Sequence, residues 1–132
     1  MSQENVEVIQ RAVAALNERD ADRYLACCTN DIELLPPTSE IEGAYEGAAG
    51  VRRFLADIQA AMPDFRLHIE RLESIGPDRM LVSLHAAMSG RTTGIGADVQ
   101  ITNIYDLAAG KIRRVQAFPD REQALEAARL KE

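Results

Sequence analysis

Four runs with strand character follow one another between residues 65 and 118, separated by short turn sequences. Along Phe65–Ile75 apolar and polar residues alternate, and the alternation slips near Glu70 and Arg71, which predicts a bulge that bends the sheet. Short turns join neighbouring strands as antiparallel hairpins, so this half of the chain predicts a bent antiparallel meander. Three further strands are expected, over Met80–Met88, Val99–Leu107 and Ile112–Phe118, with turns at 76–78, 93–97 and 108–110.

The first half of the chain instead shows the three- to four-residue apolar spacing of amphipathic helices. The first helix is expected from about Glu4 to Arg19, with Ser2 as its cap and an apolar stripe of Val6, Ile9, Val13 and Leu16. A short helix capped by Asp20 should follow it. Helices packed against one face of an antiparallel sheet give an α+β fold. The remaining elements are a strand at Asp31–Leu35, a helix at Ala48–Met62 and a last helix after Asp120, which forms a capping box with Gln123.

The length and composition of the chain exclude several functions but do not indicate a specific one. A chain of 132 residues with 46% hydrophobic side chains predicts one globular domain over residues 1–132. Its net charge of −6 argues against nucleic-acid binding, which requires clustered Lys and Arg. No run approaches the ~20 apolar residues of a membrane span, and acidic Glu4 and Glu7 stand where an export signal needs positive charge.

The cysteines and histidines indicate neither a disulfide nor a metal site. Cys27 and Cys28 are adjacent, which is poor disulfide geometry, and no ligand spacing surrounds them or His68 and His85. Free thiols are typical of a reducing compartment. We therefore expect a cytoplasmic protein without metal, cofactor, nucleic-acid partner or membrane partner.

Several stretches resemble the SnoaL-like branch of the nuclear transport factor 2-like superfamily. They are VIQRAVAALNERDADRYL, DIELLPP, YEGAAGVRRFLADI and IYDLAAGKIRRVQAFPDREQALEAARL, which together cover most of the chain. The resemblance implies a cone in which a curved antiparallel sheet wraps the long N-terminal helix, and short helices close an apolar pocket. It also implies that the helix from Arg121 to Leu130 lies at or near the mouth. Members include steroid isomerases, polyketide cyclases, epoxide hydrolases and non-catalytic binding domains, so the fold leaves the activity open.

The ketosteroid isomerases of this superfamily need a carboxylate base and an oxyanion hole made of a tyrosine and a protonated aspartic acid. The resemblance puts Ala12 at the tyrosine and Pro36 at the base. The second acid falls on Thr102 or Asn103, and the choice stays open at this point. None of these side chains supplies the isomerase chemistry.

His85 is the only candidate for a catalytic base. Limonene epoxide hydrolase, which the chain also resembles, uses an Asp-Arg-Asp set, and the resemblance puts His85, Ala87 and Ala117 at those places. Alternation along the strand puts His85 on the face of Leu81 and Ser83, and the resemblance turns this face toward the pocket. An imidazole titrates near neutrality and could act as a general base. A structural imidazole is the favoured interpretation, because no carboxylate is placed to orient the ring.

Three functions follow as hypotheses. The first is a pocket protein that binds an apolar or weakly polar metabolite, and the second is an isomerase, cyclase or lyase with His85 as base and Asn103 polarising a carbonyl. The third is an interaction module whose pocket is filled by its own side chains. A homodimer through the outer sheet face is also expected, since helices would cover only the other face. The predicted pocket lining is Tyr24, Tyr45, Phe54, Ser83, His85, Thr102, Asn103 and Ala117.

Overall fold

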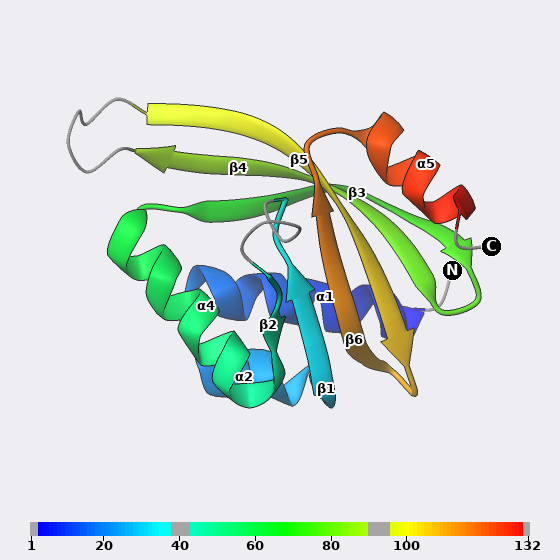
Figure 1. The fold of residues 1–132 in the computed structure, drawn as a ribbon, viewed down its shortest axis with the longest axis horizontal. Coiled ribbons are helices and arrows are strands. Elements are labelled where there is room, and N and C mark those ends of the chain that lie inside the picture. Colours follow the sequence, from blue (N-terminus) through cyan, green and yellow to red (C-terminus); the bar gives the residue numbers. More distant parts are fainter. Residues whose placement is uncertain (1–2, 38–42, 90–95, 131–132) are drawn as a thin grey trace.

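The computed structural model describes residues 3–37, 43–89 and 96–130, and it confirms an α+β fold (Figure 1). The helices are α1 (Gln3–Asn17), α2 (Ala21–Ala26), α4 (Gly47–Ala61) and α5 (Arg121–Leu130). The strands are β1 (Cys28–Leu35), β2 (Tyr45–Glu46), β3 (Arg66–Gly76), β4 (Arg79–Ser89), β5 (Gly96–Ala108) and β6 (Lys111–Phe118). The expected cap Ser2 and residues 93–95 of one expected turn lie outside the described residues.

The six strands form one curved sheet in the order β2-β1-β6-β5-β4-β3. Strands β3 to β6 pair as the antiparallel meander that the sequence predicts. Strand β1 lies parallel to β6, so the sheet is mixed. The two strands are distant in sequence, and no hairpin turn constrains their relative direction.

The curvature has a local cause in β3. Its register against β4 shifts between Ile69 and Arg71, which confirms the predicted bulge, and shifts again between Ser74 and Gly76. Each extra residue bends the strand and increases its twist. At the opposite end of the meander, Ala109 and Gly110 both have positive φ angles, 52° and 77°, as a tight hairpin between β5 and β6 requires.

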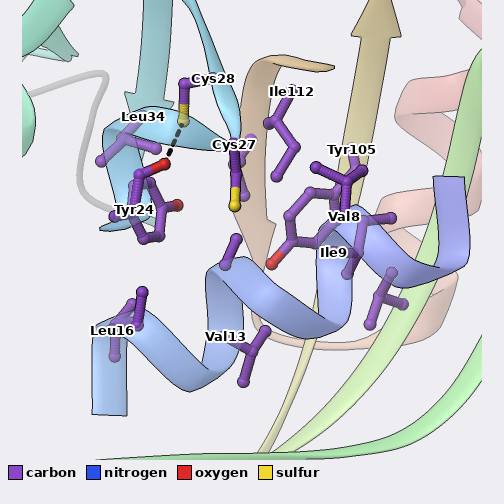
Figure 2. Packing of buried hydrophobic residues seen from close by; sticks show 14 of the residues in the cluster. Val8, Ile9, Val13, Leu16, Tyr24, Cys27, Cys28, Leu34, Tyr105 and Ile112 are labelled. Carbon is purple, nitrogen blue, oxygen red and sulfur yellow. Dashed lines mark hydrogen bonds between the residues drawn. The ribbon is translucent and has the colours of Figure 1, made fainter. Parts of the chain in front are cut away.

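The main core lies between α1 and the concave face of the sheet (Figures 1 and 2). Full burial of a large aliphatic side chain stabilises a fold by about 1.5–3 kcal/mol, so this contact provides much of the stability. The fully buried side chains on the two surfaces include Val8 and Ile9 of α1 and Ile32, Met80, Val82, Leu84 and Ile112 of the sheet.

Helix α5 packs on the opposite face of the sheet, apart from α1, α2 and α4 (Figure 1). Its Ala124 and Ala128 cover Leu81 and Ile104. The expectation that this helix lies at the mouth, with all helices on one face, is therefore wrong. The physical reason is that Leu81 and Ile104 make the outer face apolar as well, and this patch also requires a cover.

Polar contacts cap the N-terminal end of α5 and fix it to β3. Asp120 caps the helix by accepting a hydrogen bond from the backbone N–H of Gln123 at 2.8 Å, and the Gln123 side chain also donates to Asp120 at 3.1 Å. Arg121 makes a two-point ion pair with Glu73 of β3, with one N···O distance of 3.0 Å. The pairing of Asp120 with Gln123, expected from the sequence, is thus present.

Two polar side chains at and just beyond the C-terminal end of α1 bind the backbone where β3 begins. Asn17 donates from Nδ2 to the carbonyl of Leu67 at 2.9 Å and accepts from the Leu67 N–H at 2.8 Å, as a neighbouring strand would. Arg19 donates to the carbonyls of Leu16 and Phe65, both at 2.9 Å. These bonds tie the end of α1 to the edge strand of the sheet.

Replacing Asn17 by alanine should lower the free energy of unfolding by about 1–3 kcal/mol, because both backbone groups of Leu67 lose their partner. Urea denaturation followed by circular dichroism measures this change. The matched control is Gln10→Ala, at an exposed position of the same helix, which should leave the stability within about 0.5 kcal/mol. Equal stabilities for the two variants would contradict a clamp at Asn17.

Candidate functional site

A cavity of about 240 Å³ lies between the concave face of the sheet and helices α1, α2 and α4. The helices contribute aliphatic and aromatic side chains, and the five longer strands contribute the facing wall. The lining is apolar except at three side chains, those of Tyr24, Asn103 and Tyr105. In the described part of the chain, no charged side chain and no imidazole lines this cavity.

The three polar residues come from two elements. Tyr24 projects from α2, while Asn103 and Tyr105 are two residues apart on β5 and therefore share its inner face. Figure 2 shows Tyr24 and Tyr105 lying over the same helix, α1. The three side chains are buried, and the Asn103 side chain hydrogen-bonds to the Tyr105 hydroxyl.

Asn103 is a cavity residue whose hydrogen-bonding capacity is not fully used within the described part of the chain. Its Oδ1 atom is buried and has no hydrogen-bond partner within the described residues. A buried acceptor left unpaired costs about 1–3 kcal/mol, so such atoms are uncommon in stable folds. In the described part of the chain, the lining residue Asn103 therefore has a buried acceptor without a partner, and the lining around it is largely apolar.

Burial keeps the ionisable groups near the cavity neutral. It raises the pKa of Tyr105 to about 12, although the hydrogen bond from Asn103 acts in the opposite direction. Burial also raises the pKa of Tyr24 well above 10, with smaller contributions from Tyr105 and the two cysteines. The pKa of the nearby Cys28 thiol rises to about 12, mainly through burial, and this thiol donates to the carbonyl of Tyr24 at 3.2 Å. Near neutral pH these phenols and this thiol carry no charge.

Four of the residues expected at the pocket line this cavity: Tyr24, Phe54, Asn103 and Ala117. Of the two neighbouring candidates on β5, Asn103 faces the cavity. Thr102 is buried on the outer face, where its strand partners are Ser83 and Phe118. The sequence left open which of Thr102 and Asn103 faces the pocket, and this orientation assigns Asn103.

His85 and Ser83 do not line the cavity, and the expectation that their face of β4 points inward is wrong. The core side chains of this strand are Val82 and Leu84, so the odd-numbered residues point outward. His85 Nε2 lies 3.5 Å from Asp98 Oδ1, and both side chains are partly exposed. The alternation misled because Leu81 is also fully buried, beneath α5 on the outer face.

Tyr45 also lies outside this cavity. Its ring packs edge-on against Phe54, with 5.2 Å between the ring centroids, and the Arg53 guanidinium lies 4.8 Å from the Tyr45 centroid. Its hydroxyl donates to Asp57 at 2.7 Å. Tyr45 supports the cavity wall from behind through Phe54.

Tyr105 is the polar lining residue of the cavity that sequence reasoning missed, along with many of the apolar ones. It stands two positions after Asn103, and strand alternation puts both residues on one face. The alternation was therefore a sufficient signal once Asn103 was considered as a pocket residue.

No group of three or more His, Cys, Asp or Glu side chains is arranged to hold a metal ion in residues 3–37, 43–89 and 96–130. Within the same residues, no helix combines the length and apolar character that a membrane crossing needs.

Comparison with known proteins places this geometry in a family. Residues 9–115 match the SnoaL-like domain. The fold is similar to that of TerC, crystallised with polyporic acid, at 23% identity and a TM-score of 0.79 over 94% of this chain and 97% of that one. It is similar to a putative SnoaL-like polyketide cyclase from Jannaschia sp. CCS1, at 18% identity and a TM-score of 0.77 over 97% and 94% of the two chains.

A third similar structure is RV0760c from Mycobacterium tuberculosis in complex with estradiol-17beta-hemisuccinate. It is 18% identical, with a TM-score of 0.75 over 92% of this chain and 97% of that one. No curated protein matches the sequence. At these identities the solved structures establish the fold alone.

The free energy of unfolding should fall as the pH rises from about 9 toward 12. The folded pKa values of Cys28 and Tyr105, both about 12, lie above their ordinary values of 9.0 and 10.0, so the unfolded chain releases these protons first. Urea denaturation at several pH values measures the trend. Tyr105→Phe should show a shallower fall than the wild type, and an identical slope would contradict the assignment of this dependence to Tyr105.

Proposed function

The chain belongs to the SnoaL-like domain family of the nuclear transport factor 2-like superfamily, and from that premise we propose that it binds a small, neutral, largely apolar metabolite. The observation that carries the proposal is the apolar cavity between α1, α4 and the sheet, with one vacant acceptor in its wall. Neutrality of the ligand follows from the lining, because an apolar site without a counter-charge disfavours an ion strongly.

The size of the cavity limits the ligand. At about 240 Å³ it is smaller than the ~300–1,000 Å³ of most ligand pockets. A compound of one or two fused rings suits this volume better than a large polycycle. Similar folds crystallised with polyporic acid and with estradiol-17beta-hemisuccinate support the binding of a small molecule.

Binding is favoured over turnover by the chemistry of the lining. A general base must reach the proton that it removes and needs a pKa near the working pH. Tyr24 and Tyr105 are neutral phenols with raised pKa values, and Asn103 does not titrate. The isomerase, cyclase or lyase alternative relied on His85, which lies on the outer face of β4. The alternative of a pocket filled by its own side chains is disfavoured by the open volume.

Filling the cavity should weaken the binding of a small apolar molecule. Ala117→Leu adds a branched side chain to the lining and should weaken binding of the neutral fluorescent probe N-phenyl-1-naphthylamine by about tenfold or more, through lost volume. Fluorescence titration measures the affinity. Ala56→Leu, an exposed position on α4, is the matched control and should bind like the wild type. Equal binding by Ala117→Leu, or no binding of the probe by the wild-type protein, would contradict the proposal.

We also propose a cytoplasmic location and a homodimer formed through the outer face of the sheet. The free, buried thiols of Cys27 and Cys28 support a reducing compartment. Because α5 covers Leu81 and Ile104, the dimer interface would use the more polar remainder of this face around His85 and Gln100.

Light scattering at tens of micromolar should therefore give a mass twice that of the 14.5 kDa chain. His85→Glu should shift the mass toward that of one chain, because it places a carboxylate beside Asp98 in the proposed interface. Gln59→Glu, at an exposed position of α4, should not change the mass. A single-chain mass for the wild type across the concentration range would rule out the dimer.

A further inference from the structure

We propose that the ligand of this cavity carries a neutral hydrogen-bond donor, a hydroxyl or N–H group, which donates to Oδ1 of Asn103. This inference rests on the proposed function, since it requires that the cavity binds a small molecule. It adds the chemical feature by which the protein distinguishes its ligand from hydrocarbons of the same shape.

The position of Asn103 in the sheet makes its side chain part of the cavity wall. Its partners across the sheet are Val82 of β4 and Ala117 of β6, neither of which has a side-chain polar group. Asn103 is 6% exposed and lines the cavity. Burying an amide in such apolar surroundings costs free energy unless its donors and its acceptor are all hydrogen-bonded.

The Asn103 amide already hydrogen-bonds to the Tyr105 hydroxyl. The hydrogen bond from Asn103 lowers the pKa of Tyr105, against the larger rise that burial causes, so it stabilises the phenolate form. Oδ1 is the amide atom that is buried without a partner in the described residues.

The missing donor must come from outside the described side chains. A water molecule can bridge to such an oxygen in the absence of ligand. A ligand that displaces the water without supplying a donor loses that hydrogen bond, while one with a suitably placed hydroxyl restores it. Sites that pair a buried polar group with the ligand discriminate strongly against analogues that lack the matching group. We therefore expect an alcohol, phenol or N–H compound whose donor reaches Oδ1 to bind about tenfold or more tightly than an analogue of the same shape without a donor.

Three compounds with one bicyclic skeleton test this inference: tetralin has no oxygen, 1-tetralol has a hydroxyl and 1-tetralone has only a carbonyl. NMR titration of ¹⁵N-labelled protein gives each dissociation constant. The wild-type protein should bind 1-tetralol about tenfold or more tightly than tetralin, and more tightly than 1-tetralone. Asn103→Leu, close in size but without a polar group, should bind tetralin at least as well as the wild type and lose the preference for 1-tetralol.

Gln10→Leu is the matched control, because it makes the same amide-to-leucine change at an exposed position of α1, outside the cavity lining, and leaves Asn103 in place; it should retain the preference. Binding of all three compounds with equal affinity, a preference for 1-tetralone, or a preference that survives Asn103→Leu would overturn the inference while leaving the proposed function intact. Absence of binding by all three would overturn both. Should Asn103→Leu fail to fold, the wild-type ranking of the three compounds decides the matter alone.

Discussion

The contact between α1 and the concave face of the sheet is the interaction on which the rest of the structure depends. The helix presents one apolar face, and the bulges in β3 help the sheet to curve around it. A single helix is narrower than a six-stranded sheet, so α2 and α4 cover the remaining apolar surface. The cavity is the space that these three helices and the sheet enclose without filling. Asn17 and Arg19 hold the end of α1 against the start of β3, beside this space.

The outer face of the sheet explains why the same strands carry apolar side chains on both of their faces. Leu81 and Ile104 are buried by α5, while Val82 and Leu84, next to Leu81, are buried in the main core. A strand covered on both sides loses the clear alternation that shows which face points inward. Helix α5 therefore lies on the same outer face as His85, and the sheet itself separates that face from the cavity.

Asn103 and Tyr105 stand out because they are polar groups in a wall that packing alone would have made apolar. An unpaired buried oxygen lowers the stability of the fold, whereas an aliphatic side chain of the same size would not. Departures of this kind from the rules of core packing concentrate where a protein binds something. The cost to folding and the capacity to select a ligand are two consequences of the same vacant acceptor.

Much of the architecture was determined by the sequence itself, because it depends on local periodicity. The stripe from Val6 to Leu16, the slip of alternation near Glu70, the capping pair Asp120 and Gln123 and the four strand runs each reflect contacts within one element or between neighbours. The two-residue strand β2 was missed, since so short a run has no period to detect.

The site could be predicted only in part. Tyr24, Phe54, Asn103 and Ala117 line the cavity, whereas the assignment of His85 and Ser83 to it failed. Tertiary structure alone decided which face of β4 points inward, because that depends on α5 covering Leu81 from a distant part of the sequence. It also decided that Asn103 Oδ1 has no partner among the described residues, since a vacancy is a property of all the surrounding atoms. A sequence specifies which groups need burial or a hydrogen bond, and only the packed chain determines which of those needs remain unmet.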